Sequence, residues 1–264
     1  MRGNLLTLFA CISFVFFTVS PYEAQQEELP EPEGGSELTE RVRQPISNIV
    51  LQQRYPESIV LSGNQADTKI ALTFDDGPDP RFTPEILDVL KANDIQATFF
   101  LMGARAKAYP ELVARIIEEG HIIGNHTYWH PNLVEQADIA TLEREVNHTE
   151  ETLAELSGYR TKLFRAPYGF LYNDLVEKLA EMDYTIVGWS VDSLDWQETP
   201  PEVIASNVIG NIHPGAIILM HDGAEWDGDR TNTILSLQQI IPELIGQGYR
   251  FTTIPDLLNI PYQK

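Results

Sequence analysis

Short apolar runs and segments with helical periodicity alternate along the chain from residue 66 onward. The strand candidates are 69–74, 97–102, 121–125, 162–166, 184–191, 215–220 and 250–254. The helix candidates between them are 84–92, 110–119, 138–157, 173–182, 200–211 and 231–246. Strand cores such as IALTF and AIILM are continuous and partly β-branched, as in strands that are buried on both faces. This alternation predicts an α/β fold built from parallel strand–helix units.

Two architectures fit such units, an open doubly wound sheet and a closed barrel. A dinucleotide-binding open sheet carries a glycine-rich turn after its first strand. Here the first strand is followed instead by Asp75-Asp76-Gly77-Pro78. We therefore expect an incomplete (β/α) barrel with about seven parallel strands.

The first 65 residues have a different composition. Arg2 and the apolar run at 5–19 are typical of a signal peptide over 1–24, and the run is short for a membrane span. An uncleaved N-terminal membrane anchor remains the alternative. Residues 25–65 begin with a stretch rich in Pro, Gly and Glu, which predicts an acidic linker, although 41–65 could also be an ordered approach to the domain. We expect one globular domain over 66–264, and export to the envelope or the exterior.

Charge and cysteine content exclude several classes of function. The chain has 264 residues and a formal net charge of −21, and its acidic residues are not confined to one tail. Such a surface repels phosphate backbones, so we expect no nucleic-acid partner. The single cysteine, Cys11, lies in the leader, which excludes a disulfide framework, a cysteine-type zinc site and a thiol nucleophile in the domain.

Ionisable residues collect where the predicted strands end. Asp75 and Asp76 end the first strand and His126 follows the third, with His130 just beyond it. Arg165 closes the fourth strand, Asp192 the fifth and His221 the sixth. Active sites of parallel β/α barrels form at the carboxyl ends of the strands, so this pattern predicts an active site there.

The spacing of His126 and His130 suggests a metal site. Residues four apart lie on the same face of a helical turn, so both imidazoles could reach one ion. A pair of histidines at this spacing could equally well cap or pack. One aspartate added to them gives three ligands and leaves room for water, as in catalytic zinc sites, although other borderline divalent ions suit the set as well. A second aspartate beside the ion could then deprotonate the bound water, with Arg165 as its counter-ion.

His221 has two interpretations of similar weight. It could be a satisfied histidine of the core. It could also be a general acid oriented by Asp192, which we expect at the end of the neighbouring strand.

Five segments resemble the motifs of the polysaccharide deacetylases, the NodB-homology group of carbohydrate esterase family 4. They are 73–78 (TFDDGP), 126–130 (HTYWH), 165–169 (RAPYG), 192–196 (DSLDW) and 219–222 (LMHD), and they occur in this order. The resemblance covers roughly residues 69–258. It implies a distorted (β/α) barrel that removes acetyl groups from sugars with a divalent metal, most simply Zn²⁺, with Co²⁺ or Mn²⁺ as alternatives.

The resemblance also implies roles for particular residues. Asp76, His126 and His130 correspond to the metal ligands, and Asp75 to the general base that Arg165 keeps ionised. His221 corresponds to the acid for the leaving amine, tuned by Asp192, and the backbone N–H of Tyr168 to the oxyanion hole. Trp196 and Leu219 would line the acetyl pocket. Independently of the resemblance, Trp129 and Trp226 lie where sugar rings could stack, although buried packing is the commoner fate of Trp.

The sequence thus predicts a hydrolase that removes N-acetyl groups from a GlcNAc-containing polysaccharide by attack of metal-bound water. Two alternatives remain open. One is an esterase that removes O-acetyl groups from a polysaccharide such as xylan. The other is an inactive carbohydrate-binding barrel.

Overall fold

The computed structural model describes residues 44–135 and 138–264. The expected signal peptide or anchor over 1–24 and most of the expected linker lie outside these residues. Within the described part of the chain, no helix combines the length and the apolar character needed to cross a membrane.

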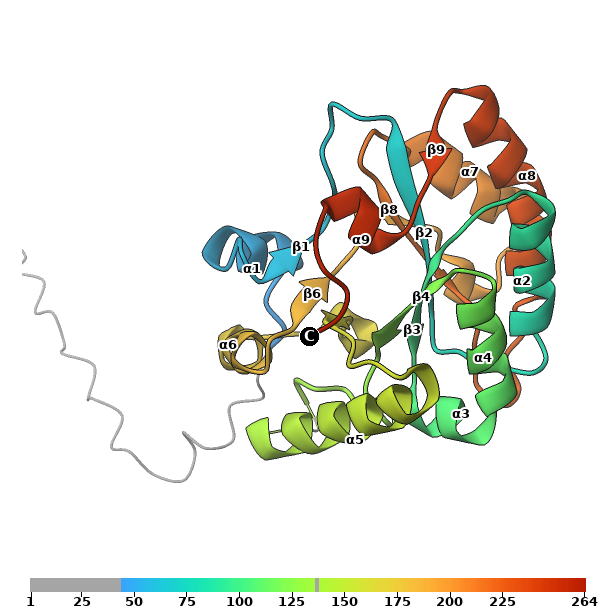
Figure 1. The fold of residues 1–264 in the computed structure, drawn as a ribbon. Coiled ribbons are helices and arrows are strands. Elements are labelled where there is room, and N and C mark those ends of the chain that lie inside the picture. Colours follow the sequence, from blue (N-terminus) through green and yellow to red (C-terminus); the bar gives the residue numbers. More distant parts are fainter. Residues whose placement is uncertain (1–43, 136–137) are drawn as a thin grey trace, which may run out of the picture. The chain divides into compact units, whose positions relative to one another are not determined.

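The fold is a curled parallel sheet with helices around it (Figure 1). The strand order is β1-β6-β5-β4-β3-β2-β8-β7, and β9 pairs with β2 outside this path. The strands are β1 (Ile59–Val60), β2 (Lys69–Asp75), β3 (Thr98–Leu101), β4 (Ile122–Asn125), β5 (Leu163–Phe164), β6 (Thr185–Val187), β7 (Val191–Asp192), β8 (Ile217–His221) and β9 (Arg250–Phe251). Every named pair is parallel, as the strand–helix alternation predicts.

The single strand expected at 184–191 is in fact two strands at opposite ends of the sheet. β6 pairs with β1 and β5, whereas β7 pairs only with β8 among the described strands. Only residues 188–190 connect them, and so few residues can span no more than about 14 Å. The two ends of the sheet must therefore approach each other. This curls the sheet into a barrel with an open seam, so the expected incomplete barrel is confirmed.

The helices begin where the sequence places helix-start residues. α2 (Thr83–Ala92) and α4 (Pro110–Glu118) have Pro in their first turn, and Asp138 caps α5 (Ile139–Ser157) by accepting a hydrogen bond from the Thr141 amide. The remaining helices are α1 (Asn48–Arg54), α3 (Gly103–Ala108), α6 (Asn173–Glu181), α7 (Pro201–Asn211), α8 (Thr231–Gly246) and α9 (Ile254–Leu258). The six expected helices are thus present, and α1, α3 and α9 were not predicted.

Side chains alternate between two sides of the curled sheet. Ile70, Leu72 and Phe74 of β2 belong to the large core between the sheet and the outer helices. Ala71 instead packs in the barrel interior, together with residues of the other strands and of α9: Phe100, Leu163, Val187, Ile217, Ile254 and Leu257. Because this period of two continues along the strand, Thr73 and Asp75 also face inward, and Asp75 lies at the carboxyl rim.

The ordered domain begins earlier than the expected boundary at residue 66. β1 pairs with β6, and Leu51 of α1 is fully buried in a core cluster with Ile59. The expectation of a linker over 25–65 is therefore wrong for residues 48–60. These two elements are short, and their apolar residues lie next to a polar stretch, so they carry little periodicity for sequence analysis to detect.

Candidate active site

The pairing of β2 with β8 places two of the expected site residues side by side. Asp75 is in register with His221 at the carboxyl ends of these strands. Asp76 and His126 follow the ends of β2 and β4, and all four residues line a pocket of about 360 Å³. The rim that the sequence predicts as an active site is therefore a real cavity.

Asp76, His126 and His130 converge on one point. Their ligand atoms all lie within 4.8 Å of one another. Oδ1 of Asp76 is 3.3 Å from Nε2 of His126 and 3.2 Å from Nε2 of His130. The same Oδ1 is buried and has no hydrogen-bond partner, so a cation between the three side chains would satisfy it.

The surroundings of the two imidazoles suit a positively charged ion. The Nδ1 of His126 lies 2.8 Å from the Arg165 carbonyl oxygen; donation to that oxygen leaves the lone pair of Nε2 facing the cluster. Burial lowers the pKa of His130 to about 4, so this ring is neutral at pH 7, as a ligand must be. Burial opposes protonation of His126, but Asp75 and Asp76 raise its pKa, which shows that the cluster favours a positive charge.

His126 and His130 converge by a different route from the expected helical turn. Both lie in a loop, in which Thr127 and His130 have positive φ angles of 65° and 58°. Neighbouring side chains hold this strained loop. Asn125 accepts a hydrogen bond from the Thr127 amide, and Glu145 of α5 accepts bonds from the amides of Tyr128 and Trp129. The helical-turn argument was therefore wrong in its geometry, although the two rings do come together.

Asp75 is held by a buried arginine. Nη1 of Arg165 donates to Oδ1 of Asp75 at 2.7 Å and to the Thr73 hydroxyl at 2.7 Å. Nε and Nη2 of the same arginine donate to the carbonyls of Val187 and Gly188. Oδ2 of Asp75 lies on the other side, 3.8 Å from Nε2 of His126. One oxygen is thus fixed by the guanidinium, and the other faces the metal cluster.

The partner of His221 is Asp195, not the expected Asp192. Nδ1 of His221 lies 2.8 Å from Oδ1 of Asp195, and Oδ2 of Asp195 accepts hydrogen bonds from the His221 amide and the Thr233 hydroxyl. Burial alone would lower the pKa of His221, but the Asp195 carboxylate raises it to about 9. Asp192 accepts a hydrogen bond from the Leu194 amide, and burial raises its pKa.

The error over Asp192 has a clear origin. Asp192 does end the strand next to β8, but its register partner is Leu219, two residues before His221. The chain then turns through Leu194, with φ 57°, into a short 3₁₀ turn at Asp195–Gln197 that brings Asp195 under His221. The segment 192–196 contains a second aspartate, Asp195, directly before Trp196. This Asp-Trp pair was the sequence signal that could have identified the partner of His221.

The pocket wall contains only part of the expected set. Tyr168, Asp192, Trp196 and Leu219 line it, and Phe170 and Trp189 were not predicted. Trp129 and Trp226 do not line it; they are 69% and 87% exposed. Tyr168 has φ 59° and is more than half exposed, with its ring edge against His130.

An Asp-His-His donor set that faces a buried Asp–Arg pair, at the rim of a β/α barrel, is the arrangement of a metal-dependent hydrolase.

Comparison with known proteins agrees with this class. The family model for polysaccharide deacetylase matches residues 62–187. A peptidoglycan-N-acetylglucosamine deacetylase of Bacillus cereus is 43% identical over 203 residues, which are 77% of this chain and 73% of that protein. A chitooligosaccharide deacetylase of Sinorhizobium fredii is 36% identical over 213 residues, covering 77% of this chain and 98% of that protein.

A solved structure is also similar. It is a peptidoglycan N-acetylglucosamine deacetylase in complex with 4-naphthalen-1-yl-N-oxidanyl-benzamide, with a TM-score of 0.77 and 40% identity over 80% of this chain and 98% of that one. The chain belongs to the polysaccharide deacetylase family.

Proposed function

We propose that this protein removes N-acetyl groups from a GlcNAc-containing polysaccharide, such as peptidoglycan or a chitin-like polymer. The observation that carries the proposal is the convergence of three units on one pocket: the metal cluster, the Asp75–Arg165 pair and the Asp195–His221 pair. The relatives named above, which act on peptidoglycan or chitooligosaccharides, support the choice of polymer.

Asp76, His126 and His130 fit a divalent ion. One carboxylate and two imidazoles favour Zn²⁺, and they also accept Co²⁺ or Mn²⁺. When bound, such an ion acts as a Lewis acid that polarises a carbonyl and lowers the pKa of water.

Asp75 is the general base in this proposal. Its Oδ1 is occupied by Arg165, so Oδ2 is the oxygen left to accept a proton from the attacking water. The guanidinium of Arg165 is buried beside this carboxylate and carries the opposite charge. Phe100 stacks on Arg165, and the carbonyls of Val187 and Gly188 accept further hydrogen bonds from it, so the guanidinium is held in place beside Oδ1.

His221 is the general acid. With a pKa of about 9 it carries a proton at pH 7, which it can donate to the departing nitrogen. An amine is a poor leaving group unless it is protonated, so a charged His221 supplies what an N-acetyl substrate needs. It does not exclude an O-acetyl ester, which is the easier substrate. The backbone N–H of Tyr168 would stabilise the oxyanion, and Trp196 and Leu219 would contact the acetyl methyl.

The functional test is mass spectrometry of products. Purified full-length protein is incubated with chitooligosaccharides, peptidoglycan fragments and acetylated xylan in the presence of a divalent ion. We expect loss of acetyl mass from the N-acetylated sugars. Loss from acetylated xylan only would favour the esterase, and binding without any loss would favour an inactive carbohydrate-binding barrel.

An Asp195→Asn variant is expected to shift the alkaline limb of the pH profile downward. The Asp195 carboxylate raises the pKa of His221, and burial lowers it, so removal of the carboxylate lowers this pKa. Loss of one close opposite charge shifts a pKa by about 1–3 units. Because the acid must be protonated, activity should decline from a correspondingly lower pH, as measured by kcat/KM from pH 6 to 10.

Asp192→Asn is the matched control, since Asp192 ends β7 just before the turn that carries Asp195, and it accepts its hydrogen bond from the Leu194 amide and not from the ring. Its shift should be smaller than that of Asp195→Asn. An equal or larger shift would return the tuning role to Asp192.

We also propose that the protein is exported. The leader at 1–24 has the composition of a signal peptide or an N-terminal anchor, and the polymers proposed as substrates lie outside the cytoplasmic membrane. The net charge of −21 argues against nucleic acid as a partner.

A further inference from the structure

Exposed aromatic side chains gather at the rim of the barrel. In the described parts of the chain, the large aromatic residues with the greatest exposure are Trp129, Tyr168, Phe170, Trp196 and Trp226. Each lies in a segment that follows the carboxyl end of a strand: β4, β5, β7 or β8. The exposed aliphatic side chains Ile49, Val203 and Ile245 lie instead on the outer helices α1, α7 and α8. This separation points to a ligand at the rim that contacts aromatic faces.

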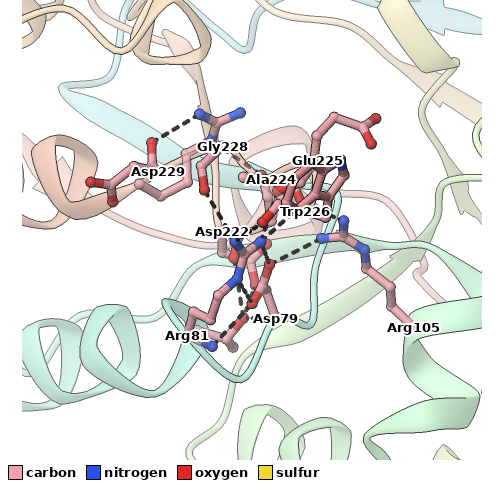
Figure 2. A network of polar contacts seen from close by, with 12 residues as sticks. Asp79, Arg81, Arg105, Asp222, Ala224, Glu225, Trp226, Gly228 and Asp229 are labelled. Atoms are coloured by element: carbon pink, nitrogen blue, oxygen red, sulfur yellow. Dashed lines mark hydrogen bonds and ion pairs between the residues drawn. The ribbon is translucent and has the colours of Figure 1, made fainter.

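Trp226 is the most exposed of these residues, and hydrogen bonds from arginine side chains hold the backbone of the loop that carries it. Arg81 donates hydrogen bonds to four backbone carbonyls of this loop, those of residues 224, 225, 226 and 228 (Figure 2). Nη2 bonds to Ala224 at 3.1 Å and Glu225 at 3.0 Å, and Nη1 bonds to Trp226 and Gly228 at 3.1 Å each. One guanidinium thus contacts the backbone along most of residues 224–228.

Arg81 is itself held by a buried carboxylate. Its Nε and Nη2 bond to the two oxygens of Asp79 at 3.0 and 2.7 Å, and Asp79 is 4% exposed. Arg105 from α3 reaches the same Asp79 and also donates to the Ala224 carbonyl. Because planar, two-point arginine–carboxylate pairs hold their geometry well, we name Asp79, Arg81 and Arg105 the loop clamp.

The loop clamp leaves the indole of Trp226 pointing outward. The carbonyls of residues 224–228 face Arg81, whereas the Trp226 side chain is 87% exposed. A side chain on a preorganised backbone loses less conformational entropy when it binds a ligand. The face of an indole carries negative charge density, which attracts the polarised C–H groups on one face of a sugar ring. The arrangement is that of a binding platform.

The platform begins beside the catalytic groups. Residues 222 and 223 follow His221 directly, and the Asp222 amide donates to the Asp75 carbonyl. Gly223 packs on the backbone of Asp76, where a Cβ atom would lie 2.4 Å from the Asp76 carbonyl oxygen. Trp226, three residues later, does not line the pocket itself. A sugar ring on Trp226 would therefore be a neighbour of the ring that enters the pocket.

We propose that Trp226, fixed by the loop clamp, binds a second sugar ring of the substrate, so that the enzyme selects chains of several sugars over single sugars. This inference rests on the proposed deacetylase function. It assigns to Trp226 a subsite outside the pocket, and to Arg81 and Asp79 the role of positioning residues for that subsite.

The test compares substrates of different length. A Trp226→Ala variant is expected to raise KM for the N-acetylglucosamine tetramer about 3- to 10-fold, from the typical worth of an aromatic contact. The ratio of KM for the tetramer to KM for the single sugar should rise, with kcat for the tetramer changing less than about two-fold, since the subsite adds binding that substrate and transition state share.

Arg81→Ala should raise the same ratio, because the loop is then free to move. In the double variant Trp226→Ala/Arg81→Ala, the ratio of KM values should be little higher than in the more affected single variant, since both residues act through one contact. Arg115→Ala is the matched control: Arg115 also joins two carboxylates and a carbonyl, but on α4. In this control, the ratio of KM for the tetramer to KM for the single sugar (the length ratio) should equal that of the wild type. Arg81→Lys, which keeps the charge without the fork, should be intermediate if the carbonyl contacts matter.

A binding measurement separates this inference from the proposed function. In an Asp75→Asn background, titration with the tetramer is followed by tryptophan fluorescence, which needs no turnover. Weaker binding after Trp226→Ala supports the subsite even if no acetate is released from any polymer, a result that would overturn only the deacetylase proposal. Wild-type affinity and an unchanged length ratio in Trp226→Ala, equal effects of Arg115→Ala and Arg81→Ala, or no binding of the tetramer at all would overturn the subsite.

Discussion

A His126→Ala variant is expected to lose both its bound divalent ion and its release of acetate. His126 provides one of three converging donors, and its ring is oriented by the Arg165 carbonyl. With two of the three donors left, the affinity for the ion should fall steeply. Metal content after dialysis, measured by atomic emission, checks the binding directly, and acetate release checks the consequence.

Two further variants make this prediction decisive. His130→Ala should show the same double loss, and it removes a less buried ring, so it guards against unfolding of His126→Ala. His213→Ala should keep both metal and activity. His213 lies in the loop before β8 and bonds to Ser190, away from the cluster. Stoichiometric metal in His126→Ala with wild-type turnover would refute the assigned ligand set.

The barrel could be predicted because its signal is repeated. Each strand–helix unit carries its own hydrophobic pattern, so uncertainty about one unit does not change the fold class. Residues 184–191 form one uninterrupted apolar run in the sequence. The run does not indicate that the chain leaves one end of the sheet here and joins the other end. That break depends on where β1 and β8 already lie, which is tertiary information.

The site was predictable at the level of residues that end long strands. Asp75 and His221 lie at the ends of β2 and β8, where the pattern defines the end to within a residue. Asp195 was missed because it comes after a strand of only two residues and a left-handed turn. Loop geometry of this kind follows from local hydrogen bonds, such as Ser193 to Asp195, and not from periodicity.

The sequence was also insufficient to distinguish between the two exposed tryptophans. Composition and loop position made sugar contact plausible for Trp129 and Trp226 alike. Only the structure separates Trp129, whose ring packs edge-on against Tyr128, from Trp226, whose loop is held by the carbonyl contacts of Arg81. The partners of a guanidinium that lie about 145 residues away in the sequence leave no local pattern.

An Asp75→Asn variant is expected to lower kcat by about 10²- to 10⁴-fold while metal binding is retained. The substitution keeps the shape of the side chain but removes its capacity to accept a proton. The amide oxygen is expected to face Nη1 of Arg165, as Oδ1 does now at 2.7 Å, which turns the NH₂ group toward the cluster. That group is a donor where the reaction needs an acceptor. Steady-state kinetics on the tetramer measure the loss.

Retention of the metal is what makes this result specific. Asp76, His126 and His130 are unchanged in the variant, so metal content should equal that of the wild type, in contrast to His126→Ala. Asp67→Asn, which alters a carboxylate paired with Arg250 on the surface, should leave kcat unchanged. Wild-type turnover in Asp75→Asn with metal bound would mean that another group takes the proton. The pairing of Asp75 with Arg165 would then serve to neutralise a buried charge, and not to prepare a base.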